Sequence, residues 1–443
     1  MAGTPAASAV PLTEPMPMSP NRFEVIVVGA GAAGLLGAAC AAQRGRQTLL
    51  LEKNRKPGAK ILMSGGTRCN ITQSTDARGI IEAFGKQGRF LHSALAALGP
   101  AELVALFEAE GVATKIEETG KIFPQSDKAT DVLAALMRRL ERSRCTLALG
   151  EPLTSLTRAG DGFQLTTPLR TLEAENVIVT TGGQSYPGCG TTGDGYAWLS
   201  ALGHTIVPPR PALTPVTTDA TWVAALRGLT ITDVAVRVMT TTRVPGASEA
   251  PPQNDLNSAT PLASARGSFL FTHFGLSGPV VLDVSRAITG HPEPKSLQLE
   301  CDFLPATRSD ALDDDLRRQC AADGKKLVVG ILARLVPRRL AETMLAGLDL
   351  TERQAGQLSN IERRQLVSAL KQTRIPVSGT RGFKKAEVTA GGVSLSEVDS
   401  RTMQSKLVPG LYLAGEILDL DGPIGGYNFQ AAFSTAWLAG ESV

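Results

Sequence analysis

The sequence predicts an α/β fold in which the first and last parts of the chain build one domain around inserted material. Near the start, VIVVGAGAAG followed by LLLEKN is typical of a strand, a glycine turn, a helix and a second strand that ends in an acidic residue. Near the end, PGLYLAGEILDLDGPIGGYNFQAAFSTAWLAG is typical of a strand, a Gly-Glu step and a glycine-rich entry into a last helix. The first pattern is the fingerprint of a dinucleotide-binding, Rossmann-like domain.

Each glycine of the first segment has a separate steric role. Gly29 permits the tight turn after the strand, Gly31 lets the backbone approach a pyrophosphate, and Gly34 lets the helix pack closely on the sheet. The helix then begins at Ala32 and Ala33 with free N–H groups and the positive end of its dipole, which favours an anion. The alternative, a glycine-rich packing turn without a ligand, does not account for the correctly spaced acid that follows.

That acid is Glu52, about 20 residues after the turn, at the end of the second predicted strand. Its carboxylate is placed to accept hydrogen bonds from ribose hydroxyls. A phosphate on the same ribose would meet a like charge, so FAD or NAD is favoured over NADP. We also expect cofactor contacts from Lys53 and, after the strand in ENVIVTT, from Thr181 and Gly182.

The last segment predicts the flavin half of the site. Gly415 lets the backbone turn beneath a pyrophosphate and ribityl chain, and Glu416 is placed to bond a ribityl or ribose hydroxyl. The N-terminus of the last helix is expected beside the flavin N1–C2=O edge, which becomes anionic on reduction, so the helix dipole would stabilise reduced flavin. The first positions of this helix complete the predicted contacts: Gly425, Gly426, Tyr427 and Asn428.

A long functional loop is predicted after Glu52, because KNRKPGAKILMSGGTRCNIT is rich in Gly, Lys and Arg and lacks helical periodicity. Arg68 could neutralise the pyrophosphate or a substrate anion, and Asn70 could bond the flavin pyrimidine edge. Equally, these residues could only shape the loop. Cys69 is interpreted as a buried small side chain rather than a nucleophile. The candidate FAD contacts on this loop are Lys60, Ser64, Gly65, Arg68 and Asn70.

The order of patterns along the chain predicts an interrupted domain. Residues 1–21 are rich in Pro, Ala and Ser and are expected to be a disordered tail rather than a signal peptide. The FAD-binding domain is expected over 22–205 and again over 375–443. A β-rich inserted domain is expected over 206–310 and a helical insertion over 311–374.

Composition narrows the class of protein. The 443 residues are 43% hydrophobic and 20% charged, as in an ordinary soluble globular protein, and a net charge of +3 does not by itself indicate a nucleic-acid partner. The six cysteines are scattered without a CxxC or a Cys/His cluster, so neither a metal site nor a disulfide-reductase centre is expected. Residues 25–42 are uncharged, but their glycines indicate strand, turn and helix rather than a membrane span. A cytoplasmic protein with reduced thiols is the expectation.

Several motifs occur together in an order that carries a family resemblance. They are VIVVGAGAAGLLGA, GAKILMSGGTRCNIT, KIFPQSDKATDVLAAL, TGGQSYPGCGTTGDGY, FTHFGLSGPVVLDVS and the block from AEVTAGGVSL to the last helix. On these residues the chain resembles the bacterial FAD-dependent, NAD(P)/FAD-type oxidoreductases known as conserved flavoproteins or aminoacetone-oxidase-family enzymes, which are related to bile-acid-reducing flavoproteins. The resemblance implies an FAD domain with two insertions, a small β-barrel and a helical one. In relatives the second motif reads GGGRCN, so Thr67 stands where a glycine is expected.

Candidates for chemistry beyond the flavin are fewer. His273 in FTHFGLSGP is the best acid–base candidate, because imidazole titrates near neutral pH. A purely structural role of this histidine in the turn is an equally weighted alternative. Tyr186 could line the site or only pack. The helical insertion is basic in places, and acids are sparse from Arg363 to Lys385, which leaves open an RNA phosphate footprint.

These patterns favour an FAD-dependent oxidoreductase that transfers a hydride between flavin N5 and a substrate. NAD(P)H could reduce the flavin, but since no second complete fingerprint is present it would bind transiently. A small molecule is the favoured substrate, either an enone that is reduced or an amine that is oxidised. The alternatives are reduction of a uridine in ribosomal RNA, which the resemblance also implies, and a flavin-binding protein without turnover. The sequence predicts neither substrate identity nor oligomeric state.

Overall fold

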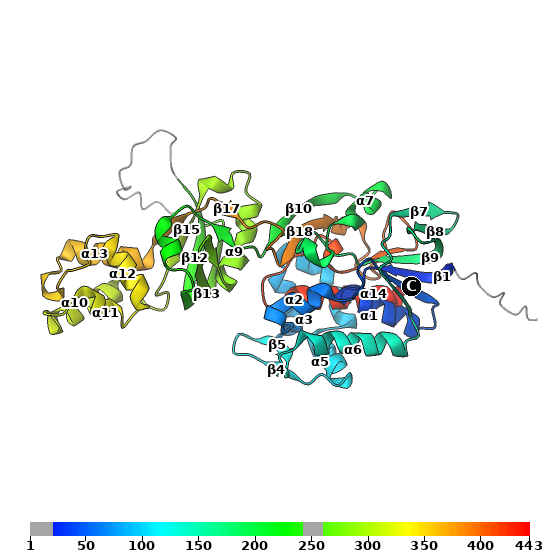
Figure 1. The fold of residues 1–443 in the computed structure, drawn as a ribbon, viewed down its shortest axis with the longest axis horizontal. Helices are drawn as coiled ribbons and strands as arrows, with labels where there is room; N and C mark the ends of the chain where they lie inside the picture. The colour runs from blue at the N-terminus through cyan, green and yellow to red at the C-terminus, as the bar shows by residue number, and fades with distance from the viewer. Residues whose placement is uncertain (1–20, 242–259) are drawn as a thin grey trace, which may run out of the picture.

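The computed structural model describes residues 21–241 and 260–443, so nearly all of the predicted tail lies outside the described residues. The chain is elongated, with three parts in a row (Figure 1). An α/β domain that holds the C-terminus forms one end, an antiparallel sheet follows, and a group of helices forms the other end. The first and last parts of the chain therefore build one domain, and the predicted insertions project from it.

A mostly parallel sheet is the centre of the α/β domain. Strands run in the order β6-β2-β1-β9, with β19 also paired to β9, and the hairpin β7-β8 extends the sheet in the antiparallel sense. Val28 pairs with both Leu51 and Val179, so the carboxyl ends of β1, β2 and β9 lie at one edge. The bounds are β1 Arg22–Val28, β2 Thr48–Glu52, β6 Thr146–Leu149, β7 Ser155–Ala159, β8 Gly162–Thr166, β9 Thr171–Val179 and β19 Leu411–Leu413.

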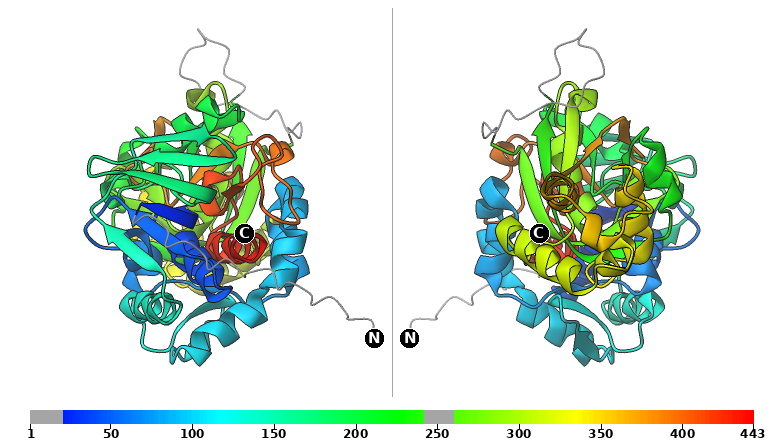
Figure 2. Two further views of the ribbon diagram at one scale, coloured as in Figure 1. Left: turned by 90° about the vertical axis from the view of Figure 1, so that its right-hand side faces the viewer. Right: turned by 90° about the vertical axis from the view of Figure 1, so that its left-hand side faces the viewer.

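The first and last helices pack against each other on this sheet. A Cβ added at Gly37 of α1 (Ala32–Gln43) would lie 3.1 Å from the Ala436 carbonyl of α14 (Tyr427–Ser442), and one at Gly440 would lie 2.6 Å from the Gly37 carbonyl. Figure 2 shows the last helix end-on beside the first part of the chain. Small residues therefore bring the two ends of the chain into contact, which confirms that they share one Rossmann-like domain.

The segment after β2 differs from the predicted loop. Residues Ala59–Thr67 form α2, whose first turns are regular and whose path breaks at Ser64, Gly65 and Gly66. The prediction of a loop was wrong there because the glycines end the helix without preventing its start. The other elements of this domain are α3 Ala77–Ala83, α4 His92–Ala97, α5 Pro100–Ala109, α6 Ala129–Arg142, α7 Asp194–Ala201 and the small sheet of β3 Thr72–Gln73, β5 Lys121–Pro124 and β4 Thr114–Ile116.

The inserted domain is an antiparallel sheet in the order β16-β15-β12-β13-β14-β11-β17. Its two edge strands, β16 and β17, are separated by only Val377 and Ser378, so the ends of the sheet curl toward each other. The bounds are β11 Val216–Thr217, β12 Thr230–Thr240, β13 Ala263–Thr272, β14 Gly275–Ser277, β15 Leu297–Asp302, β16 Thr373–Pro376 and β17 Gly379–Thr380, with helices α8 Thr221–Ala225 and α9 Pro279–Thr289.

Strand pairing places the boundaries between the α/β domain and the inserted domain at other residues than the sequence predicted. β10 (Ile206–Ala212), expected in the inserted domain, pairs instead with β18 (Val388–Val393) in a separate two-stranded sheet. β17 lies beyond the predicted return at residue 375, yet it still pairs within the inserted sheet. The domain boundaries depend on which strands pair, and these partners lie far apart in the chain. The local sequence pattern does not show which distant strands will pair.

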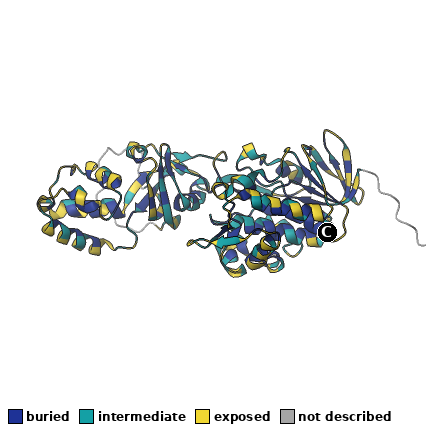
Figure 3. Cartoon of the chain, turned by 60° about the horizontal axis from the view of Figure 1, so that its bottom comes forward, coloured by how far each residue is buried: buried dark blue, intermediate teal, exposed yellow. Residues whose placement is uncertain are grey.

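The helical insertion comprises α10 Ser309–Ala322, α11 Val328–Leu332, α12 Arg338–Ala346 and α13 Asn360–Lys371. Ser359 and Glu362 form a reciprocal capping box at the start of α13. Apolar residues of these helices share one buried cluster with the inserted sheet, and Figure 3 shows buried and exposed stripes along the helices. The insertion is therefore packed on the sheet rather than tethered to it.

Within residues 21–241 and 260–443, no single helix is long and apolar enough to cross a membrane. One bent pair, Gly85–Ala97 and Pro100–Ala109, reaches the length and composition of a span only when both parts are counted across a 43° bend.

Candidate FAD site

A cavity of about 550 Å³ lies at the carboxyl edge of the parallel sheet. Its walls come from the β1–α1 turn, the α2 segment, the start of α14 and, from the inserted domain, β14 and α9. The two ends of the chain and the insertion thus meet around one space.

The glycines of the β1–α1 turn have the three predicted geometries. Gly29 has φ +104°, and its added Cβ would lie 2.8 Å from the Thr180 carbonyl. A Cβ at Gly34 would lie 1.7 Å from the Gly29 carbonyl, so this residue permits the contact between helix and turn. Gly31 lines the cavity, and an added Cβ there would meet nothing within 4 Å. The open space at Gly31 is where a pyrophosphate would approach the backbone.

Glu52 is buried at the end of β2 and lines the cavity. Its Oε2 accepts a hydrogen bond from the Ala30 amide at 2.7 Å, and Oε1 accepts one from the Asn54 amide at 2.8 Å. The carboxylate therefore holds the glycine turn against β2. Each oxygen keeps a further lone pair for a ribose hydroxyl.

The neighbouring predicted contacts are also at the cavity. Lys53 Nζ donates to Thr192 Oγ1 at 2.6 Å and forms an ion pair with Asp194 at 2.5 Å. Gly182 has φ +71°. The hydroxyl of Thr181 is buried and has no hydrogen-bond partner within the part of the chain that the structure describes. A polar ligand in the cavity would supply the partner that this hydroxyl lacks.

The break in α2 is built from left-handed backbone. Gly65, Gly66 and Thr67 have φ of +55°, +67° and +71°, and Cys69 has φ +61°. For a β-branched residue such as Thr67 this conformation is strained. Thr67 therefore keeps the backbone that a glycine would adopt rather than closing the loop. Cys69 is fully buried, and burial raises the pKa of its thiol to about 12, as expected of a packed side chain.

Arg68 and Asn70 bond to protein groups. Arg68 lines the cavity, but its guanidinium pairs with Glu117 at 2.5 Å and with Asp127 at 3.4 Å and stacks 4.0 Å from the centre of the Phe123 ring. Its charge is thus already neutralised, which removes the reason for assigning it to a pyrophosphate. The Asn70 amide faces the Thr72 and Ile122 carbonyls and the Gly426 N–H, so its nitrogen donates to the carbonyls and its oxygen accepts from Gly426.

Lys60 and Glu416 form the centre of a polar group that joins the two chain ends. Lys60 Nζ lies 2.5 Å from Glu416 Oε2 and donates to Ser185 Oγ at 3.0 Å. Glu416 Oε1 accepts from Ser185 Oγ and from the Thr389 amide, both at 2.8 Å. Both Lys60 and Glu416 line the cavity as predicted. Ser64, the remaining candidate of this segment, also lines it, although its hydroxyl donates to the Ile61 carbonyl.

The last helix reaches the cavity through its glycines. Gly415, Gly425 and Gly426 line it, and all three have positive φ. Asn428 also lines it, but its amide bonds to Gly422 and Pro423, so it orders the preceding turn. Tyr427 is not among the lining residues and packs against the apolar cluster that includes Leu420 and Ala431, so its contact with the flavin stays a prediction.

Two helix N-termini face the cavity without a side-chain cap. α1 begins after Gly31 and α14 begins after Gly426, and neither glycine offers a capping group. Uncapped N–H groups at two ends of one cavity suit the two polar regions of FAD, the pyrophosphate and the flavin N1–C2=O edge. Together with the open space at Gly31 and the unpartnered Thr181 hydroxyl, these features fit FAD. No group of three or more His, Cys, Asp or Glu side chains in the described ranges is arranged to hold a metal ion.

The acid–base candidate His273 does not lie at the cavity. His273 is exposed in the turn between β13 and β14 and is not among the lining residues, although Ser277 and Pro279 of the same motif are. Tyr186 does line the cavity, with φ +54°, and burial raises the pKa of its hydroxyl. The motif reaches the cavity through its final residues, because the turn itself points away.

Glu387 is a cavity residue that the sequence reasoning missed. Its carboxyl makes no hydrogen bond or ion pair with any residue that the structure describes, and burial raises its pKa, opposed by the charges of Lys60 and Lys121. Nearby, Asp283 of α9 accepts a hydrogen bond from the Ile424 amide at 2.8 Å, and burial raises its pKa to about 6. No local pattern in AEVTAGGVSL distinguishes Glu387 from an ordinary surface glutamate.

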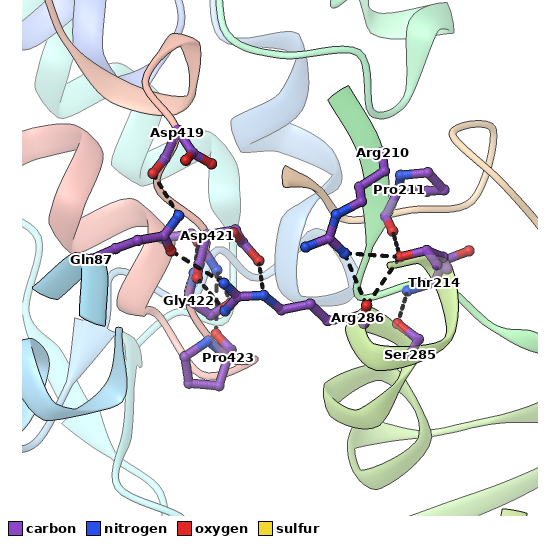
Figure 4. A network of polar contacts seen from close by, with 12 residues as sticks. Gln87, Arg210, Pro211, Thr214, Ser285, Arg286, Asp419, Asp421, Gly422 and Pro423 are labelled. Carbon is purple, nitrogen blue, oxygen red and sulfur yellow. Dashed lines mark hydrogen bonds and ion pairs between the residues drawn. The ribbon is translucent and has the colours of Figure 1, made fainter. Parts of the chain in front are cut away.

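A polar network holds the inserted domain against the α14 approach segment, 419–426 (Figure 4). Arg286 of α9 donates to Gln87 Oε1 and to the Asp421 carbonyl, both at 3.3 Å, and Gln87 donates to the Asp419 carbonyl at 2.7 Å. Arg210 donates to the Arg286 carbonyl at 2.9 Å. Because this segment lines the cavity at Leu420 and Ile424, the network sets the position of one cavity wall.

The cations of the helical insertion are mostly paired with acids, which weighs against the predicted RNA footprint there. Arg363 forms a bidentate pair with Asp313, and Lys371 is buried beside Asp302. The other ion pairs of this part are Arg317–Asp314, Arg318–Asp315, Arg334–Asp323, Arg338–Glu342 and Arg353–Glu362.

Comparison with known proteins shows the family and the fold of the chain. The family described as HI0933-like protein Rossmann domain matches residues 23–442. The chain is 33% identical to the ribosomal RNA dihydrouridine synthase of Escherichia coli K12, over 96% of this chain and 98% of that protein. It is 32% identical to a 3-dehydro-bile acid delta(4,6)-reductase of Clostridium scindens, over 95% and 98%. A 3-ketosteroid delta1-dehydrogenase from Sterolibacterium denitrificans shares the fold, with a TM-score of 0.50, 14% identity and coverage of 95% and 99%.

Proposed function

The chain belongs to the HI0933-like family of FAD-dependent oxidoreductases, and from this membership we propose that it reduces a carbon–carbon double bond conjugated to a carbonyl. The observation that carries the proposal is the chemistry shared by two full-length relatives. Dihydrouridine is uridine with hydrogen added across its C5–C6 bond, and a delta(4,6)-reductase of a 3-dehydro bile acid adds hydrogen across bonds conjugated to a ketone.

A uridine of ribosomal RNA is the substrate we favour, with the small-molecule enone as the second candidate. When bound, FAD supplies a hydride to the β-carbon of the conjugated system, and NAD(P)H restores its electrons. The α-carbon then requires a proton. The apolar wall from Pro279 and Leu282 supports the enone as a second candidate, since it suits a flat hydrocarbon as well as a pyrimidine.

We assign the proton to Glu387. Its carboxyl lines the cavity, has no hydrogen-bond partner in the described chain, and is kept protonated toward higher pH because burial raises its pKa. Lys60 and Lys121 carry positive charge beside it and would favour the carboxylate left after proton transfer. Tyr186 also lines the cavity within electrostatic reach of Glu387, and we propose that its hydroxyl orients the substrate carbonyl.

The test is an anaerobic absorbance experiment on the purified protein with FAD bound. NADH and then NADPH are added while the visible flavin band is followed. We expect bleaching by one of them, then return of the band on addition of either a uridine-containing RNA or a 3-oxo-Δ4 steroid, with product identified by a mass gain of two hydrogens. Return of colour only with oxygen, together with bleaching by amines alone, would contradict the proposal in favour of an amine oxidase. A flavin that nothing bleaches would indicate a protein without turnover.

A further inference from the structure

We infer that residues 381–385, here called the basic loop, are the surface that binds the phosphate backbone of an RNA substrate beside the cavity. The inference rests on the proposed function and identifies the docking site for its favoured substrate. The basic loop connects β17 to β18 and contains Arg381, Lys384 and Lys385.

The charge of the basic loop is unopposed. Lys384 and Lys385 are exposed, and none of the three cations forms an ion pair with an acidic residue in the described part of the chain. The nearest acid in sequence, Glu387, belongs to the cavity instead. In contrast, most cations of the helical insertion are held by carboxylates, so releasing these to phosphates would break existing pairs. Cations without an acidic partner contribute most to the free energy of binding a polyanion, because the gain from counterion release is not reduced by the loss of existing ion pairs.

The basic loop is attached directly to the cavity wall. The Phe383 carbonyl accepts a hydrogen bond from the Tyr186 amide at 3.0 Å, and Tyr186 lines the cavity. The Arg381 amide donates to the Pro215 carbonyl at 2.9 Å, which ties the loop to the inserted domain. A phosphate bound here would therefore lie close to the part of the cavity wall that Tyr186 forms.

Aromatic rings lie among these cations. The Arg381 guanidinium stacks 4.4 Å from the centre of the Phe274 ring, and His273 meets the same ring edge-on at 5.0 Å. His273 is exposed, and Phe274 and Phe383 are partly exposed. Arginine planes and aromatic rings beside unpaired cations are the recognition chemistry of single-stranded RNA, whose bases stack while lysines bind phosphates. A uridine that enters the cavity must leave the base stack of the RNA. The aromatic side chains of this surface could then stack with the bases on either side of that uridine.

The test compares two double charge reversals in the FAD-loaded full chain. K384E/K385E changes the basic loop, and R317E/R318E makes the same charge change on ion-paired, exposed positions of α10. Binding of a short fluorescein-labelled RNA oligonucleotide containing uridine is followed by anisotropy between about 50 and 200 mM salt. We expect K384E/K385E to weaken binding by tenfold or more and to reduce the salt slope by about 1.4, the value for two phosphate contacts on a single strand. The control should bind like the unmodified protein.

Equal binding by both variants, or no RNA binding by the unmodified protein at the lowest salt, would overturn the inference. Turnover of the 3-oxo-Δ4 steroid by the unmodified protein and both variants separates this failure from failure of the proposed function. Neither lysine lines the cavity, so steroid turnover should be the same in all three proteins. If neither steroid nor RNA restores the colour of the reduced unmodified protein, it is the proposed function that fails.

Discussion

Arg286 Nε lies 3.0 Å from Asp421 Oδ2, and this ion pair joins α9 of the inserted domain to the segment that enters α14. The Asp421 side chain is 2% exposed, whereas that of Arg286 is 42% exposed. Burial raises the pKa of Asp421 to about 6, although Arg286 and Arg210 oppose the shift. A buried carboxylate with one main cationic partner makes the position of this cavity wall depend on Arg286.

Replacing Arg286 by alanine should therefore destabilise the protein in a pH-dependent way. Removing one partner of a buried pair costs about 3 to 5 kcal/mol, and because Arg286 is 42% exposed we expect a loss at the lower end of that range at pH 7. The folded protein keeps a proton on Asp421 up to about pH 6, while the unfolded chain loses it near its ordinary value of 3.8, so this group lowers stability as pH rises through that window. In R286A the window should extend to higher pH. Urea midpoints measured from pH 5 to pH 8 check this, and R286A/D421N should recover part of the loss; a loss independent of pH would contradict it.

Replacing Thr67 by glycine should stabilise the protein. Thr67 is exposed with φ +71°, a conformation that costs a β-branched residue about 1 to 2 kcal/mol and glycine almost nothing. Since glycine also gives the unfolded chain more freedom, the net gain should be about 1 kcal/mol. The matched control is T130G in the first turn of α6, where the same exchange should lower the free energy of unfolding. Both are measured by urea unfolding, and a shift of the same sign in both would refute the argument from φ.

Substitutions of two glycines in the β1–α1 turn should separate cofactor binding from folding. At Gly31, with φ −83°, a valine side chain would enter open cavity space, so G31V should fold normally and lose FAD. At Gly34 the first added carbon would collide with the Gly29 carbonyl at 1.7 Å, so G34A should lower stability by about 1 to 3 kcal/mol. Flavin absorbance per protein and thermal unfolding of the flavin-free form distinguish the two; full flavin occupancy in G31V would place the pyrophosphate elsewhere.

Substitutions of Glu387 and His273 should have different effects on turnover. E387Q should reduce the rate of enone reduction by tenfold or more and should abolish the decline in rate that deprotonation of Glu387 causes as pH rises. Flavin reduction by NAD(P)H should be unaffected, since that step needs no proton from Glu387. H273A should leave enone reduction unchanged, because His273 is exposed outside the cavity lining. Stopped-flow absorbance resolves the two half-reactions, and a pH profile in E387Q that matches the unmodified protein would remove Glu387 from the chemistry.

Local steric demands made much of the cofactor site predictable. Gly29 and Gly34 occupy positions where a side chain would strike backbone, so their roles can be argued from spacing alone. Glu416 was expected from its carboxylate directly after the glycine step, and Lys60 from its place on the segment after β2; both line the cavity. The sequence reasoning did not foresee that Arg68 is already paired with Glu117, because their partnership depends on how the α2 segment folds onto β4 and β5.

The sequence by itself determined the Rossmann-like domain, its formation from both ends of the chain and its nucleotide cradle, because turns, helix starts and strand spacing are consequences of nearby residues. Only the tertiary structure decided which side chains share the cavity with that cradle. Glu387 lines the cavity and His273 does not, while the Arg286–Asp421 pair joins the inserted domain to the segment that forms part of the cavity wall. Such placements depend on contacts between residues more than a hundred positions apart, and no local pattern encodes them.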